Sequence, residues 1–301
     1  MAADEDKPKE LTPEEQARRE HFRQRVLLEK RIGNRMNVIR HKVLVASGKG
    51  GVGKTTAAVN LALAFSQAGD RVALLDADIH GPGVPFALGM RGVHATGGEH
   101  TLNPPAYDER LAVMSMAFLM EGNADAVIWR GPLKMAMIDN FLADVDWGPR
   151  DWLVVDTPPG TGDEILSLAQ RIKPLDGLIV VTTGQAAALA SSRKSLSFAR
   201  QMRVPVVGVI ENMGPFPCAS CGREVALFGA GGGRAVAQEF GVPFLGAVPF
   251  DPQVAAAADA GTPALVSFPD GAVAAAWRNA AAEVKRAVAA AGGDEGGASK
   301  E

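Results

Sequence analysis

The chain has 301 residues, of which 47% are hydrophobic and 22% are charged, and its formal net charge is −3. These values are typical of a globular protein with a substantial core, and they disfavour strong nonspecific binding of nucleic acid. No apolar run approaches the ~18 residues that span a bilayer, and the N-terminal segment is too charged for a secretory signal. We therefore expect a cytoplasmic protein that binds no membrane and no specific nucleic acid.

Residues 1–35 are expected to form a charged tail and a helix. Thr12 suits the N-cap of that helix, and Pro13 suits its first position. The helix is expected to continue to about residue 31, with mixed charges that indicate a solvated face. Nothing in this region predicts chemistry.

A glycine-rich loop follows the apolar run at 43–46 and precedes residues with helical periodicity. It holds the complete pattern Gly-x-x-x-x-Gly-Lys-Thr in the strand-loop-helix context that a phosphate-binding loop requires. Glycines let successive backbone N–H groups face an anion, and the following helix adds its positive N-terminal end. We expect Lys54 to reach the β- and γ-phosphates of a nucleotide and Thr55 to hold Mg²⁺. The nucleotide-binding residues expected here are Gly48, Lys49, Gly50, Gly51, Val52, Gly53, Lys54, Thr55 and Thr56.

Acidic side chains follow two predicted strands at their carboxyl ends, where open α/β sheets bind ligands. Asp76 and Asp78 come after one such strand, and Asp156 ends another at 151–156. Asp156 matches the carboxylate that binds Mg²⁺ in nucleotide hydrolases. A loop rich in glycine and proline follows Asp156 at 157–163. A capping or turn role is the alternative for the first two aspartates, since Asp is common in turns.

The segment between these two strands is less regular. Residues 89–110 are rich in glycine and proline, and the nearby histidines lack the spacing of a metal site. A strand is expected at 111–119. A helix is expected at 133–143, introduced by Trp129-Arg130-Gly131-Pro132.

Further strands are expected at 178–182, 206–210 and 244–248, with a helix at 186–202 between the first two. This β-α alternation predicts an α/β fold with a doubly wound, mostly parallel sheet and helices on both faces. The expected regions are 1–35 for the tail and helix, 36–291 for a single nucleotide-binding domain ending in an alanine-rich helix at 271–290, and 292–301 for a disordered tail.

The two cysteines of the chain, Cys218 and Cys221, lie in a loop at 214–229 that is rich in glycine and proline. Thiolates three positions apart can hold one metal ion or one edge of a cluster, but zinc and [4Fe–4S] sites usually need four ligands. Two chains that meet on a two-fold axis near this loop supply all four. The alternatives are a redox pair, a shared zinc ion or a pair without function.

Lys49 makes the glycine-rich loop resemble the deviant Walker A class of ATPases, which includes MinD, ParA and the nitrogenase iron protein. The resemblance implies a homodimer in which Lys49 reaches the phosphates bound by the partner and stabilises the transferring phosphoryl group. It also implies catalytic roles for Lys54 and for Asp78, which orients or activates the attacking water. By this resemblance, the loops at 76–83 and 157–163 are the two switches that order with the γ-phosphate. By the same resemblance, the Mg²⁺ ligands are Thr55, Asp76 and Asp156, and the adenine contacts are Asn212, Pro249 and Asp251.

A closer resemblance lies in the cysteine loop and the segments beside it. The carboxylate loop and the segments Asn212-Met213-Gly214, Cys218-x-x-Cys221-Gly222 and Leu227-Phe228-Gly229 are similar to the Mrp/ApbC family of iron–sulfur cluster carrier ATPases. The resemblance implies Mg²⁺-dependent ATP hydrolysis and a labile [4Fe–4S] cluster held by Cys218 and Cys221 of two chains. It also implies delivery of the cluster to apo iron–sulfur proteins, and contact with cluster scaffold proteins.

Two other functions remain open. A ParA- or MinD-like positioning ATPase that binds DNA or membrane agrees with the nucleotide site. The acidic balance, the cysteine pair and the scarcity of bulky apolar residues at 271–290 disfavour it. A reductase similar to the nitrogenase iron protein needs cluster cysteines in two separate loops, and this chain has cysteines in one loop only.

Overall fold

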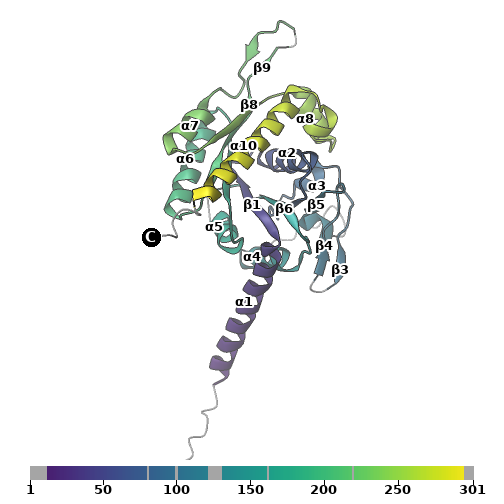
Figure 1. The fold of residues 1–301 in the computed structure, drawn as a ribbon, viewed down its shortest axis with the longest axis vertical. Coiled ribbons are helices and arrows are strands. Elements are labelled where there is room, and N and C mark those ends of the chain that lie inside the picture. The colour runs from purple at the N-terminus through teal and green to yellow at the C-terminus, as the bar shows by residue number, and fades with distance from the viewer. Residues whose placement is uncertain are drawn as a thin grey trace, which may run out of the picture.

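In the computed structural model, the described residues are 12–79, 81–98, 101–120, 131–160, 163–218 and 220–294. A seven-stranded sheet with the order β11-β8-β7-β1-β6-β2-β5 forms the centre of the molecule (Figure 1). Each pair of neighbours in this sheet is parallel, which confirms the expected α/β fold. The strands are β1 (Ile39–Ala46), β2 (Val72–Asp76), β5 (Leu111–Met114), β6 (Arg150–Asp156), β7 (Gly177–Thr182), β8 (Val206–Gly214) and β11 (Phe244–Pro249).

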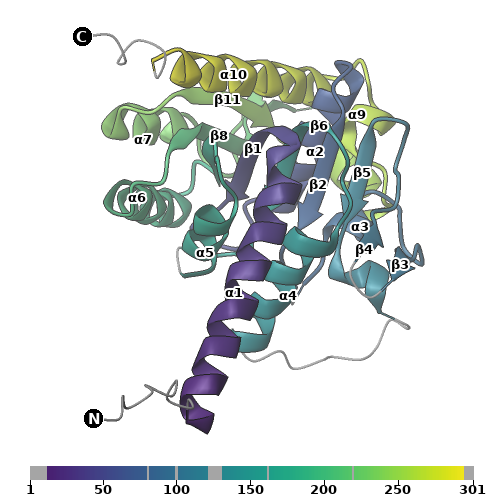
Figure 2. The ribbon, with the colours of Figure 1, turned by 60° about the horizontal axis from the view of Figure 1, so that its bottom comes forward.

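Helices lie on both sides of this sheet (Figures 1 and 2). Helix α2 (Lys54–Gln67) packs against α10 (Ala272–Asp294), whereas α6 (Ala186–Gln201) and α7 (Gly232–Phe240) pack against β7 and β8. The remaining elements are α1 (Pro13–Asn37), α3 (Val84–Ala87), α4 (Gly131–Asp144), α5 (Asp163–Arg171), α8 (Pro252–Asp259), α9 (Ala264–Ser267), the 3-10 helix η1 (Met116–Leu119), and the hairpins β3–β4 (Thr96–Gly98, Thr101–Asn103) and β9–β10 (Phe216–Pro217, Glu224–Val225).

The central strands are covered on both faces, which explains why their sequences are continuously apolar. All residues of β2 and β7 are buried, as are residues 43–46 of β1. Phe65 of α2 stacks on Trp152 of β6 with ring centroids 4.5 Å apart. This packing fixes the carboxyl ends of the strands, and therefore the loops that follow them, relative to one another.

Helix α1 projects from the body of the molecule (Figures 1 and 2). Its N-terminus is a capping box, in which the Thr12 side chain accepts from the Glu15 N–H and the Glu15 carboxylate accepts from the Thr12 N–H. The helix ends at Asn37 instead of near residue 31, because Ile32 and Met36 are buried against the core and extend its packed face.

Three further boundaries differ from those expected. The strand expected at 111–119 ends at Met114, because the Ser115 side chain accepts from the Ala117 N–H and begins η1. The irregular region at 89–110 contains the β3–β4 hairpin. Helix α10 continues to Asp294, so residues 292–294 belong to it and not to a tail.

Several expectations fall on positions that the structure leaves undescribed. They concern the tail at 1–11, the helix entry at 129–130, the switch residues 161–162, the histidines at 80 and 100, and residues 295–301. Within the described part of the chain, no helix has the length and apolar character needed to cross a bilayer.

Candidate nucleotide site and cysteine hairpin

The phosphate-binding loop connects β1 to α2 with a backbone that requires glycine. Gly51 and Gly53 have φ angles of 79° and 82°, and Gly53 is the N-cap of α2. A Cβ on Gly48 would lie 2.3 Å from the backbone oxygen of Ser191 in α6. Lys49 is exposed to solvent, where another chain can reach it. The loop thus combines a backbone suited to phosphate with an accessible lysine.

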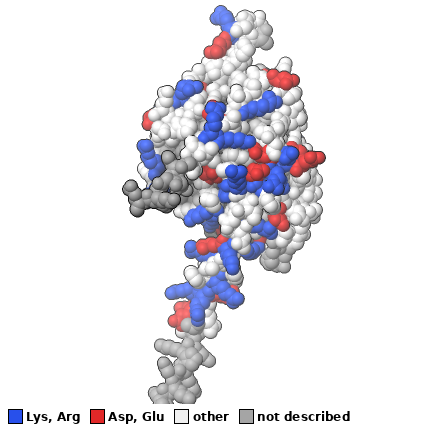
Figure 3. Space-filling model, in the orientation of Figure 1, with Lys and Arg blue, Asp and Glu red and all other residues white. Residues whose placement is uncertain are grey.

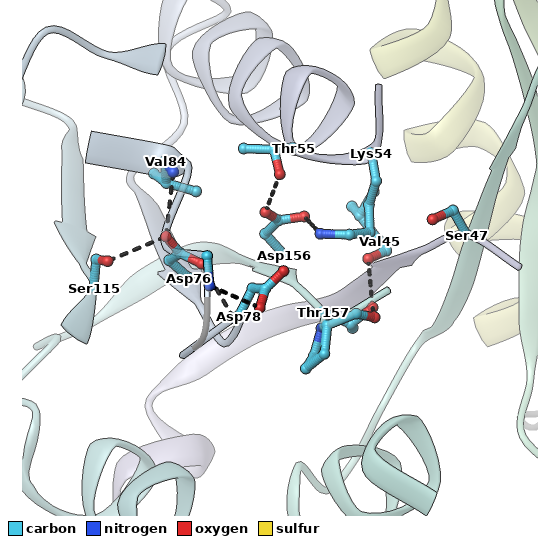
Figure 4. Close-up of polar contacts among 12 residues, drawn as sticks. Val45, Ser47, Lys54, Thr55, Asp76, Asp78, Val84, Ser115, Asp156 and Thr157 are labelled. Carbon is cyan, nitrogen blue, oxygen red and sulfur yellow. Dashed lines mark hydrogen bonds and ion pairs between the residues drawn. The ribbon is translucent and has the colours of Figure 1, made fainter. Parts of the chain in front are cut away.

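Lys54, Thr55 and Asp156 form a polar cluster at the end of this loop (Figure 4). The Lys54 Nζ lies 2.5 Å from Asp156 Oδ1, and the Thr55 hydroxyl donates to Asp156 Oδ2 at 2.7 Å. The side chains of Lys54 and Asp156 are 7% and 0% exposed. The structure therefore brings together three of the residues expected to bind Mg²⁺ and the phosphates.

Asp76 and Asp156 are opposite each other in the register of β2 and β6, and both are buried. Burial and then the charge of Asp156 raise the pKa of Asp76 to about 8. Burial also raises the pKa of Asp156, although the neighbouring Lys54 ammonium opposes this shift. The Lys54 ammonium is therefore the cation beside two carboxylates whose ionisation burial disfavours.

A divalent cation fits this arrangement of charge. A hydroxyl and two carboxylates are the oxygen ligands that Mg²⁺ prefers, and its charge relieves the repulsion between Asp76 and Asp156. When bound, Mg²⁺ supplies charge neutralisation to the β- and γ-phosphates. The ligand set Thr55, Asp76 and Asp156 stays a prediction.

Two loops that follow strands lie beside this cluster (Figure 4). The Asp78 N–H donates to Asp76 Oδ1 at 3.2 Å, and the charge of Asp78 contributes to the raised pKa of Asp156. The Thr157 hydroxyl donates to the Val45 carbonyl at 3.0 Å. Both expected switch loops therefore begin next to the nucleotide site. The action of Asp78 on a water molecule stays a prediction.

The residues expected to contact adenine already have protein partners. Asn212 donates from Nδ2 to the Val52 carbonyl at 3.0 Å. Asp251 caps α8 by accepting from the Gln253 N–H at 2.8 Å, and Pro249 ends β11. This capping contact alone accounts for an aspartate at position 251, whether or not a nucleotide binds there. Base recognition by Asn212, Pro249 and Asp251 stays a prediction.

Cys218 and Cys221 lie in the loop between β9 and β10, and this hairpin projects from the body at the end opposite α1 (Figure 1). The loop is closed by the Cys218 N–H, which donates to the Arg223 carbonyl, and by the Gly222 N–H, which donates to the Cys218 carbonyl, both at 2.8 Å. Gly222 has a φ of 70°, which glycine adopts without strain. Cys221 is exposed and Cys218 is partly exposed.

The hairpin favours the thiolate form of Cys218. Hydrogen bonds from the N–H groups of Ser220 and Cys221 lower the pKa of the Cys218 thiol. The thiolate is the form that binds metals. Among the described residues, no three His, Cys, Asp or Glu side chains gather as a metal site. Within one chain, therefore, the cysteine pair offers two of the four ligands that a cluster or zinc ion usually takes.

Two buried contacts at the same edge of the sheet were not predicted. The Ser115 hydroxyl, just after β5, donates to Asp76 Oδ2 at 3.1 Å. The Glu211 carboxylate of β8 accepts from the N–H groups of Gly231 and Gly233 at 2.9 and 2.6 Å. Their signal is a polar residue at the carboxyl end of an apolar strand, which is the signal that marked Asp76 and Asp156.

The family described as NUBPL iron-transfer P-loop NTPase matches residues 38–285. The chain belongs to this NUBPL family. The resemblance to iron–sulfur cluster carrier ATPases and the P-loop NTPase fold are thereby confirmed.

Relatives from several organisms match most of this NUBPL-family chain. The iron-sulfur cluster carrier protein of Methanocaldococcus jannaschii is 43% identical over 233 residues, which are 77% of this chain and 80% of that protein. The cytosolic Fe-S cluster assembly factor NUBP2 homolog of Culex quinquefasciatus is 45% identical over 239 residues, 78% of this chain and 93% of that protein. The structure of a nucleotide-binding protein from Archaeoglobus fulgidus in complex with ADP is 34% identical, has a TM-score of 0.67, and covers 77% of this chain and 91% of its own.

Replacing Asp76 with asparagine tests the raised pKa. The folded protein holds a proton on Asp76 up to about pH 8, whereas the ordinary carboxyl pKa is 3.8. Between these values the folded state binds more protons than the unfolded state, so the free energy of unfolding falls as the pH rises. Asparagine cannot ionise, so we expect Asp76→Asn to flatten this fall between pH 5 and 8. Urea denaturation at several pH values measures the free energy of unfolding, in a chelating buffer that keeps the site free of metal ions.

The matched control is Asp259→Asn, which removes one carboxylate from an exposed position in α8. It should leave the slope of stability against pH close to that of the wild type. Parallel curves for the wild type and Asp76→Asn would contradict the raised pKa.

Proposed function

We propose that two copies of this chain form a homodimeric ATPase that carries a labile [4Fe–4S] cluster and transfers it to apo iron–sulfur proteins. The observation that carries the proposal is the pair of accessible thiols on a projecting hairpin, which gives half of a cluster's ligands, in a chain with a P-loop. A two-fold axis near the hairpins supplies the other half.

The proposed hydrolysis uses the residues gathered at the sheet edge. The backbone of the phosphate-binding loop and Lys54 hold the phosphates of ATP, and Thr55 and the two buried carboxylates hold Mg²⁺. Water, oriented by Asp78, attacks the γ-phosphorus, and the bond to the β–γ bridging oxygen breaks to release ADP and phosphate. Lys49 of the partner subunit places a second cation at the charge that develops on the transferring group.

The proposed cargo site follows from the chemistry of the cysteine loop. A lowered pKa makes Cys218 available as a thiolate, and the partly open loop leaves the sulfur atoms accessible to a recipient protein. Loops that order with the γ-phosphate alter the contact between the two chains and hence the angle between them. This angle determines how well the four thiolates fit one cluster. ATP turnover is thereby tied to loading or delivery.

The relatives support this reading. The proteins at 43% and 45% identity are named a cluster carrier and a cluster assembly factor, and the neighbour at 34% identity binds ADP. A positioning ATPase that binds DNA is the competing function. On the face in Figure 3, positive and negative side chains are interleaved, which is unlike the broad positive field that nonspecific DNA binding uses. We place the protein in the cytoplasm because the relative at 45% identity is named a cytosolic assembly factor.

Anaerobic reconstitution with iron and sulfide tests the cargo site. The wild type should gain a broad visible absorption band, because four thiolates from two chains bind the cluster. Cys218→Ala and Cys221→Ala should each lose most of this band. The matched control is Glu224→Ala in β10, which removes an exposed side chain of the same hairpin and keeps both thiols. Full absorbance in both cysteine variants would contradict the assignment of Cys218 and Cys221 as cluster ligands.

Lys49→Ala tests the contribution of the partner to hydrolysis. Because Lys49 is exposed and outside the buried cluster, the variant should fold and bind ATP nearly as well as the wild type. Its kcat should fall by about 10²- to 10³-fold, the usual effect of removing one group that stabilises a transition state. Lys194→Ala, an exposed lysine of α6, is the control. Steady-state phosphate release measures both.

A mixing experiment separates action in trans from action within one chain. Lys49→Ala chains retain Lys54, and Lys54→Ala chains retain Lys49. Mixed dimers therefore contain one complete site if Lys49 acts across the interface, and turnover should partly return. Wild-type turnover in Lys49→Ala alone, or none in the mixture, would remove the proposed role in trans.

A further inference from the structure

Strand β8 connects the phosphate-binding loop directly to the cysteine hairpin. Its residue Asn212 donates from Nδ2 to the Val52 carbonyl of that loop at 3.0 Å. A Cβ on Gly53 would lie 2.1 Å from the same nitrogen, so the amide fills the space beside the loop. Cys218 lies only a few residues further along the same segment. A shift of the loop backbone at Val52 or Gly53 would therefore move the Asn212 side chain.

A strained residue follows this contact. Met213 has a φ of 56°, in the left-handed region that is unfavourable for an L-residue other than glycine. Its neighbours hold it there, since Asn212 is tied to the loop and the Gly214 carbonyl accepts from the Phe250 N–H at 3.0 Å. A strained residue that is held from both sides is sensitive to a shift of either neighbour.

Phe250 connects both sides of the hairpin to this point. Its ring makes edge-to-face contacts with Phe216, in β9, and with Phe228, which follows β10, at centroid distances of 5.4 and 5.8 Å. Phe216 leads into the cysteine loop and Phe228 leads out of it. One ring thus sets the position of both ends of the hairpin relative to β8.

The returning side of the hairpin is also fixed to the sheet. A Cβ on Gly229 would lie 2.6 Å from the Gly184 oxygen, just after β7, so the two backbones are in close contact. Glu211 holds the N–H groups of Gly231 and Gly233. Movement at Gly214 reaches Phe216 along the chain, and the Phe250 ring connects it to both sides of the hairpin at once.

We propose that Phe250 is a positioning residue that links occupancy of the phosphate-binding loop to the arrangement of Cys218 and Cys221. The inference rests on the proposed function, since it explains how ATP controls the thiolates. A shift at Val52 passes through Asn212 and Met213 to Gly214, and then through the Phe250 ring to both sides of the hairpin. Nucleotide and cluster must then affect each other's affinity by the same factor.

Alkylation of the two thiols by iodoacetamide tests this link in cluster-free protein. We expect Mg²⁺ and a non-hydrolysable ATP analogue to change the alkylation rate of the wild type by about fivefold or more, the range of a typical coupling. Phe250→Ala should bring the ratio of the two rates close to one. Phe250→Tyr, which keeps the ring, should retain the wild-type ratio, as should the control Phe22→Ala in the exposed part of α1.

Phe250→Leu keeps an apolar side chain but loses the aromatic edge contacts, and it replaces alanine if that variant unfolds. The link is overturned if the wild-type rate does not respond to the analogue, or if the alanine or leucine variant responds as the wild type does. Failure of the carrier function itself is seen separately, as missing absorbance in the reconstituted wild type. The alkylation result stands in that case, because the assay uses no cluster.

Discussion

Parallel pairing of β2 with β6 places two buried carboxylates side by side, and the rest of the nucleotide site follows from this constraint. Asp76 and Asp156 share one register position, and Lys54 neutralises only one of them. Two like charges in a desolvated place are unfavourable, so a proton or a divalent cation is needed there. The glycines of the neighbouring loop complete the site by offering N–H groups to the phosphates that such a cation accompanies.

The nucleotide site was predictable because its signals are local. The loop from Gly48 to Thr56 carries its own motif, and each aspartate ends a short apolar strand whose partners in a parallel sheet meet at one edge. The order of strands in the sheet and the contact of Ser115 with Asp76 depend on pairing between distant segments, which the pattern of one strand does not encode. The strand expected to reach residue 119 ends early because Ser115 interrupts the apolar run and caps η1.

The cysteine pair was also visible in the sequence, but its setting was not. The spacing of Cys218 and Cys221 indicates ligation, whereas the hydrogen bonds that favour the thiolate arise only when the loop closes. The Phe216–Phe250–Phe228 contacts join three segments that are separate in the sequence. They connect both sides of the projecting hairpin to the segment after β11. The proposed two-chain cargo site depends on the position of the hairpin, because four sulfur atoms must meet with defined geometry.

In the proposed homodimer neither site is complete in one chain, because Lys49 is expected to act on the partner's phosphates and each hairpin provides a single cysteine pair. Native mass spectrometry under anaerobic conditions, on protein reconstituted in the presence of Mg²⁺ and the ATP analogue, tests this claim most directly. We expect a species of two chains with one [4Fe–4S] cluster and two nucleotides. A single chain that holds a complete cluster, or a dimer with one cluster in each chain, would contradict it.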